Sequence, residues 1–204
     1  MERAAVTVRP YEYPNEPHRR RHGPTGYADY SRYLPWLKDE FSFRCVYCLK
    51  RIVWAPTDQW VVDHLISRAE APDLECEYDN LVLACQFCNG RKGSKRVPDP
   101  CRVAYSRCLR VEEDGRITVI GRPGNILINV LRLNHPWLVE QRRNQIKILA
   151  TLARANQKLF NQLMGYPLDL CDLRKLRNPG NRRPEGLQNS HLARRERNEL
   201  PAVY

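Results

Sequence analysis

Four of the eight cysteines stand in two C-x-x-C pairs, Cys45 with Cys48 and Cys85 with Cys88. Four thiolates in such pairs can hold one zinc ion tetrahedrally, with each sulfur about 2.3 Å from the metal. Because four protein ligands leave no open position for water or substrate, this Zn²⁺ would be structural and would contribute directly to folding. The spacing therefore predicts a zinc clasp that closes residues 49–84 into a loop.

Two other interpretations of these cysteines stay open. Four buried free thiols would need no metal, whereas redox chemistry is disfavoured because no thioredoxin-like βαβ pattern surrounds either pair. The remaining cysteines fit no second site, and we expect them to be reduced thiols. They are Cys76, Cys101, Cys108 and Cys171.

The loop between the cysteine pairs carries Asp63-His64, and Asn89 follows the second pair directly. Hydrolysis of a phosphodiester needs a base that activates water, a divalent cation that holds the phosphate, and positive charge near the leaving oxygen. Histidine suits the first role because it is mostly neutral at physiological pH. Asp and Asn oxygens suit a hard cation such as Mg²⁺. A lone histidine in an apolar run is more often a packed core residue, so the hypothesis depends on the surrounding cysteines.

The order C-x-x-C, D-H, D-N-L and C-x-x-C-N-x-x-K-G resembles the HNH endonuclease family with its ββα-metal core. The resemblance covers roughly a quarter of the chain, from about Phe43 to Lys95. It implies that His64 is the general base and that Asp63 is a ligand of a catalytic Mg²⁺ or Mn²⁺ ion.

The same resemblance assigns the two asparagines. Asn89 would be the second ligand of the catalytic ion, at a position where several members of the family carry His. An Asn just after a cysteine pair could equally cap the start of a helix. Asn80 corresponds to the family's central Asn, which braces the loop that holds the catalytic His, so its expected role is orienting.

Basic residues follow Asn89 in the sequence. Lys92 lies three residues beyond Asn89, on the same face of a helix, and resembles the family's phosphate-contacting residue. A solvated charged face is the alternative for this basic group. The expected nucleic-acid-binding residues are Arg91, Lys92, Lys95 and Arg96.

The implied function is hydrolysis of DNA phosphodiester bonds with one divalent metal ion and a histidine base, in the minor groove of duplex DNA. Two other function classes stay open. One is a non-catalytic zinc-dependent nucleic-acid-binding module, in which the Asp-His pair only packs. The other is a protein-interaction adaptor that uses the Tyr-rich N-terminal arm and the basic tail. Neither class needs the combination of Asp63, His64 and Asn89.

The overall charge agrees with a nucleic-acid partner. The formal net charge is +11, from 34 basic and 23 acidic residues, and Lys and Arg release counterions when they neutralise phosphates. No apolar stretch approaches the roughly 18 residues of a membrane span, and the N-terminus lacks an apolar signal core, so we expect a cytoplasmic protein with no membrane partner. One active site per chain cuts one DNA strand at a time, so a homodimer or a larger complex is a possible assembly for cutting both strands.

The sequence patterns around these residues predict both helices and strands, and therefore an α+β fold. We expect a helical turn over 35–43, strands over 60–66 and 81–84, and a short helix that ends near Gly93. A hairpin over 107–121 turns at Asp114-Gly115, and a helix begins at His135-Pro136 and runs to about Gly165. Since adjacent strand side chains point to opposite faces, Asp63 and His64 can serve one phosphate only at a strand end or a distortion.

The domain organisation follows from these elements. Residues 1–34 form an extended Pro/Tyr/Arg-rich arm, and residues 35–100 form the ββα-metal core with its zinc clasp. Residues 101–173 supply the hairpin and a long helix that packs on the core. Residues 174–204 are basic, with Pro and Gly at intervals and few large apolar groups, and predict a flexible or partner-ordered tail.

Overall fold

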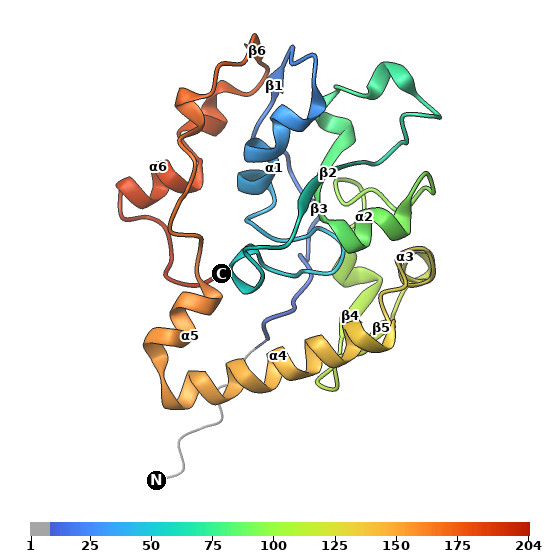
Figure 1. The fold of residues 1–204 in the computed structure, drawn as a ribbon, viewed down its shortest axis with the longest axis vertical. Coiled ribbons are helices and arrows are strands. Elements are labelled where there is room, and N and C mark those ends of the chain that lie inside the picture. Colours follow the sequence, from blue (N-terminus) through green and yellow to red (C-terminus); the bar gives the residue numbers. More distant parts are fainter. Residues whose placement is uncertain (1–8) are drawn as a thin grey trace.

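The hairpin between the two cysteine pairs lies at the centre of the fold (Figure 1). The computed structural model describes residues 9–204, so residues 1–8 of the predicted arm lie outside the described part. Strand β2 (Trp60–His64) pairs antiparallel with β3 (Leu81–Cys85), and helix α2 (Gln86–Lys92) follows β3 directly. Gly93 ends α2 with a φ of +53°, a conformation that costs glycine little. The predicted ββα order and the α+β fold class are confirmed.

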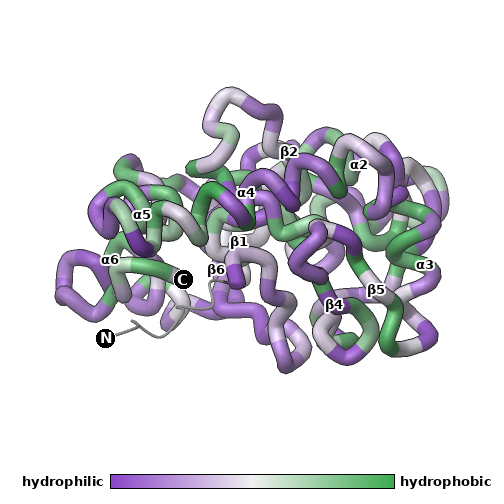
Figure 2. Tube along the Cα trace, turned by 90° about the horizontal axis from the view of Figure 1, so that it is seen from below, coloured by the Kyte–Doolittle hydropathy of each residue, from purple (hydrophilic) through white to green (hydrophobic). Residues whose placement is uncertain are grey.

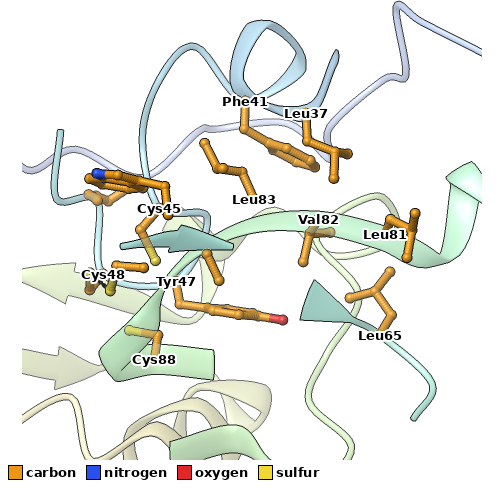
Figure 3. Packing of buried hydrophobic residues seen from close by; sticks show 14 of the residues in the cluster. Leu37, Phe41, Cys45, Tyr47, Cys48, Leu65, Leu81, Val82, Leu83 and Cys88 are labelled. Carbon is orange, nitrogen blue, oxygen red and sulfur yellow. Dashed lines mark hydrogen bonds between the residues drawn. The ribbon is translucent and has the colours of Figure 1, made fainter. Parts of the chain in front are cut away.

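Strand β3 is buried at all five of its residues, which explains its uninterrupted apolar sequence. Helix α1 (Leu34–Glu40) packs on one side of it, where Leu37 and Phe41 lie above the strand (Figure 3). The ring of Tyr47 lies on the other side of the strand (Figure 3). The hairpin is therefore held between two apolar layers, and its register is strongly specified.

The predicted second hairpin is present as β4 (Leu109–Val111) and β5 (Ile117–Val119), with Gly115 at a φ of +84° in the turn. Helix α3 (Arg122–Leu131) follows it and is an element that the sequence patterns did not predict. Pro123 lies in its first turn, where a proline is tolerated because the backbone N–H groups there have no partner within the helix.

The predicted long helix is two helices, α4 (Pro136–Ala155) and α5 (Gln157–Met164). Asn156 interrupts them with an extended φ of −150°, and its side chain accepts a hydrogen bond from the Leu159 amide, which caps α5. Helix α4 is hydrophilic along much of its length (Figure 2) and buries only Leu138, Arg142 and Leu149.

The C-terminal residues are packed, so the expectation of a flexible 174–204 tail is corrected. Strand β6 (Gly180–Asn181) pairs antiparallel with β1 (Pro24–Thr25), and helix α6 (His191–Glu196) buries its first residue. The reason is a partner far away in sequence: Asp39 of α1 accepts a 2.8 Å hydrogen bond from the backbone N–H of His191. Arg183 of this segment also forms a salt bridge with Asp79 of the core, at 3.0 Å.

The described part of the N-terminal arm is mostly without regular structure, and packing orders it. The side chains of Tyr11, Tyr13 and Tyr27 are buried in the main hydrophobic cluster. Within residues 9–204, no helix combines the length and the apolar character that crossing a lipid bilayer would require.

Candidate active site and metal centre

The four predicted zinc ligands lie together. The Sγ atoms of Cys45, Cys48, Cys85 and Cys88 are all within 4.8 Å of one another, and all four residues are buried. Cys48 Sγ lies 3.8 Å from Cys85 Sγ, and tetrahedral thiolates about 2.3 Å from a zinc ion are separated by about 3.8 Å. The cluster can therefore hold one structural metal ion such as zinc.

Local backbone structure brings the two cysteine pairs together. The first pair lies in a tight turn in which the Leu49 amide donates to Cys45 O and Leu49 adopts a φ of +62°. The second pair spans the junction of β3 and α2, with Cys85 as the N-cap residue of the helix. The Val46 amide donates to Leu83 O at 3.0 Å, so the first turn is fastened directly to β3.

Asp63 is the next-to-last residue of β2, and only 3% of its surface is exposed. Its carboxylate accepts two hydrogen bonds, one from the Tyr47 hydroxyl at 2.5 Å and one from the Lys92 ammonium at 3.2 Å. Burial raises the pKa of Asp63, whereas the charge of Lys92 and the Tyr47 hydroxyl act in the opposite direction. The site thus holds a buried carboxyl group with polar partners on both oxygens.

His64 is the last residue of β2, so the strand ends two residues before the end of the predicted strand over 60–66, and Asp63 and His64 lie at a strand end. Its Nε2 lies 2.9 Å from the carbonyl oxygen of Glu75, and its ring packs edge-on against Tyr30 with centroids 4.8 Å apart. Because a carbonyl only accepts, Nε2 must carry the proton, which leaves Nδ1 of the neutral ring as an acceptor. Burial lowers the pKa of His64 and favours this neutral form.

Asn80 holds the loop that follows β2. Its Oδ1 accepts from the Ile66 amide at 2.9 Å, and its Nδ2 donates to Ile66 O at 3.0 Å and Leu74 O at 3.2 Å. Leu74 is the neighbour of Glu75, whose carbonyl accepts from His64. These contacts fit the orienting role expected of Asn80.

Asn89 lies within α2, four residues after the N-cap Cys85, and its side chain does not cap the helix. It is half-buried and precedes Lys92 by one helical turn. Since the Lys92 ammonium reaches Asp63, this face of α2 is directed at the end of β2. By helical spacing, Asn89 lies on the same side of α2 as Lys92.

The four basic candidates are not equivalent. Lys92 is only 1% exposed, and its ammonium donates to Asp63 Oδ1 and to the carbonyl oxygen of His64. The phosphate-contacting role expected of Lys92 therefore does not fit, because the ammonium is occupied and shielded from solvent. Arg91, Lys95 and Arg96 are exposed, although Arg96 also pairs with Glu70.

Three residues of this centre were not predicted from the sequence. They are Tyr30 and Glu75, which contact His64, and Tyr47, which contacts Asp63. The position of Tyr47 inside the first C-x-x-C pair is a signal that could have identified it. No sequence signal of this kind identifies Tyr30 or Glu75. Tyr30 contacts His64 through its ring, and Glu75 contacts it through a backbone carbonyl that any residue has.

The comparisons with known proteins agree with this geometry. Residues 45–95 match the family model described as HNH endonuclease, and the search of curated proteins found no match. The matched segment contains the four clustered cysteines, the β2–β3 hairpin and α2. Such a domain indicates a nuclease or another nucleic-acid-related function. Residues 45–95 of this chain are therefore an HNH domain.

Proposed function

We propose that this protein is a metal-dependent endonuclease that hydrolyses phosphodiester bonds of DNA, with His64 as the general base. The observation that carries the proposal is the arrangement at the end of β2. There, His64 is held by the Glu75 carbonyl, and the neighbouring Asp63 carboxylate faces the α2 face that carries Asn89.

The hydrogen bond at Nε2 defines what His64 can do. With Nε2 as the donor to Glu75 O, the unprotonated Nδ1 can take a proton from a water molecule. The carbonyl oxygen also stabilises the imidazolium that this transfer forms, because its partial negative charge lies 2.9 Å from Nε2. The ring of Tyr30 restricts the orientation of the imidazole.

The chain's own residues fit a hard divalent cation beside this base. Asp63 and Asn89 would hold a Mg²⁺ or Mn²⁺ ion through a carboxylate oxygen and an amide oxygen. When bound, such an ion supplies positive charge to the phosphate and to the leaving oxygen. In the metal-free protein two hydrogen bonds fix the Asp63 carboxylate, one from the Tyr47 hydroxyl to Oδ2 and one from the Lys92 ammonium to Oδ1.

Charge supports DNA as the substrate. The net charge of +11 favours a polyanion, and Arg91 and Lys95 are exposed on α2 and directly after it. Both residues belong to the segment around the helix that carries Asn89. A DNA phosphate backbone that they contact would therefore lie near the end of β2. Their expected role is to bind phosphates without reading sequence.

A non-catalytic nucleic-acid-binding module is the second candidate. The observation in its favour is the completed buried pair of Asp63 and Lys92, which could serve folding alone. It predicts salt-sensitive DNA binding that does not depend on Mg²⁺, and no cleavage with any divalent metal.

A cleavage assay on supercoiled plasmid DNA separates the two candidates. We expect nicking or linearisation with Mg²⁺ or Mn²⁺, none with EDTA, and none with His64→Ala, whose zinc content should equal that of the wild type. His135→Ala is the matched control, because His135 precedes α4 and belongs to neither site. Full activity of His64→Ala would overturn the base assignment. DNA binding without cleavage by the wild type would favour the second candidate.

A further inference from the structure

One side chain joins the cysteine cluster to the candidate catalytic centre. Tyr47 lies between Cys45 and Cys48, is completely buried, and donates its hydroxyl to Asp63 Oδ2 at 2.5 Å. Figure 3 shows its ring beneath β3, with the hydroxyl pointing away from Cys48. A hydroxyl bonded to a carboxylate at this distance is a strong, directional contact.

The backbone of Tyr47 is held from several sides. Its carbonyl oxygen accepts a 2.8 Å hydrogen bond from the Tyr13 hydroxyl, and the preceding amide of Val46 donates to Leu83 O. The neighbouring cysteines belong to the cluster that can hold a metal ion. The hydroxyl of Tyr47 is consequently presented to Asp63 from a rigid support.

The two oxygens of Asp63 have different partners. Oδ2 accepts from Tyr47, whereas Oδ1 lies 3.2 Å from the Lys92 ammonium of α2. Asn89 precedes Lys92 by three residues in α2, a spacing that puts two side chains on one side of a helix. The hydroxyl fixes Oδ2, so Oδ1, which accepts from Lys92 in the metal-free protein, is the oxygen that faces α2.

We propose that Tyr47 is a positioning residue, which holds Asp63 so that Oδ1 is presented to a divalent cation, and that the cysteine cluster thereby orients the catalytic carboxylate. This inference rests on the proposed function of the Asp63 site. Hydrogen bonds from groups behind a metal ligand fix its orientation, and their loss commonly weakens metal binding by about 10- to 100-fold.

A buried tyrosine of this fold can satisfy its hydroxyl without a carboxylate. Tyr13 and Tyr105 satisfy their hydroxyls with backbone carbonyl oxygens, at 2.8 Å and 2.6 Å. Tyr47 instead bonds a carboxylate whose burial is itself unfavourable. Removing the hydroxyl would leave Oδ2 without this donor and would free the carboxylate to rotate.

The test is Tyr47→Phe, with Tyr78→Phe as the matched control. Tyr78 is also buried and also donates to a buried carboxylate, Glu40 Oε2 at 3.1 Å, but Glu40 is outside the candidate site. Zinc-loaded proteins are titrated with Mn²⁺ by calorimetry, so that the cysteines do not compete. We expect Tyr47→Phe to keep its zinc and to bind Mn²⁺ at least about tenfold more weakly. Tyr78→Phe should bind Mn²⁺ as the wild type does.

Mn²⁺ affinity within twofold of the wild type in folded Tyr47→Phe would overturn the proposal. If that variant does not fold, the wild-type protein provides the second measurement, the NMR signal of the Tyr47 hydroxyl proton during a Mg²⁺ titration. A shift of that signal supports the proposal, and an unchanged signal at saturating Mg²⁺ contradicts it. If the wild-type protein binds Mn²⁺ but cuts no DNA, the nuclease function is refuted. The role of Tyr47 is then still decided by the Mn²⁺ affinity of Tyr47→Phe. Absence of Mn²⁺ binding overturns both.

Discussion

The Lys92 ammonium lies 3.2 Å from Asp63 Oδ1, and both side chains are almost completely buried. The same ammonium also donates to the backbone carbonyl of His64. One cation from α2 thus contacts both residues at the end of β2. In the absence of a divalent ion, Lys92 is the charge partner of Asp63, which connects the stability of the hairpin to the chemistry of the site.

Replacing Lys92 with Met should destabilise the metal-free protein strongly. The variant keeps most of the side-chain volume but leaves a buried carboxylate without its cation, which costs about 3–5 kcal/mol. A divalent ion that binds Asp63 should restore part of this loss. Urea unfolding with and without Mg²⁺ measures both effects, and Lys95→Met, at an exposed position, is the control. Equal stability of Lys92→Met and wild type would contradict the importance of the pair.

The pH dependence of cleavage should follow His64. Burial lowers the pKa of His64, although the Glu75 carbonyl and the Asp63 charge act in the opposite direction. Since the base must be neutral, cleavage should decline only as the pH falls below the ordinary histidine value of about 6.5. Single-turnover rates at saturating Mg²⁺ between pH 5 and pH 8 give the acidic limb. An acidic limb of the pH–rate profile centred above pH 7 would contradict a lowered pKa of His64.

The two kinds of metal should be separable. Brief EDTA treatment should stop cleavage while zinc content and circular dichroism stay unchanged, because four thiolates hold zinc far more tightly than two oxygen ligands hold Mg²⁺. Cys88→Ser should lose zinc and most of its folded structure, since the cluster connects β3, α2 and the first turn. Cys171→Ser is the control at an exposed cysteine. A folded Cys88→Ser without zinc would show that the cluster is not a folding element.

Asn80→Ala should loosen the loop that carries Glu75. The variant loses one acceptor and two donor contacts, to Ile66 and Leu74, and each group left unsatisfied costs about 1–3 kcal/mol. We expect faster hydrogen exchange of the Ile66 amide and a lower cleavage rate at saturating Mg²⁺. An unchanged exchange rate at Ile66 would refute the bracing role.

Acid should destabilise the contact between α1 and the N-terminal arm. Burial raises the pKa of Glu40, but hydrogen bonds and charges from His18, His22 and Arg21 outweigh it and lower this pKa to about 2. A carboxylate with a depressed pKa stabilises the fold above its unfolded pKa of about 4.3, and this contribution disappears as the pH falls toward 2. The difference between about 4.3 and about 2 corresponds to a contribution on the order of 3 kcal/mol while His18 and His22 are charged.

Glu40→Gln tests that contribution by urea unfolding at pH 7 and pH 3. The variant should be less stable than the wild type at pH 7 and should lose less stability on acidification. Glu113→Gln, at an exposed position, should behave as the wild type does. If Glu40→Gln kept the full pH dependence, other groups would be responsible for the acid sensitivity.

The local patterns were enough to predict the centre of the fold. The cysteine spacing, the Asp-His pair and the asparagines lie within residues 45–95, and the two strands and α2 have apolar runs and end signals of their own. A tetrahedral metal site and a short hairpin depend on residues at short or fixed separations, so their geometry is implied by residue type and spacing. The need of two adjacent side chains to serve one phosphate called for a strand end or a distortion near Asp63 and His64, and β2 ends at His64.

The tertiary structure decided what depends on partners far apart in sequence. A basic residue such as Lys92 carries the same local signal whether it faces solvent or a buried carboxylate, and only the packing of α2 on β2 selects Asp63 as its partner. The same holds for His191. It belongs to a basic, polar segment, and it is buried because Asp39 of α1 accepts a hydrogen bond from its backbone N–H. Amino-acid types alone determined the cysteine frame and the catalytic candidates, whereas charge burial and the Tyr47 contact arose from long-range packing.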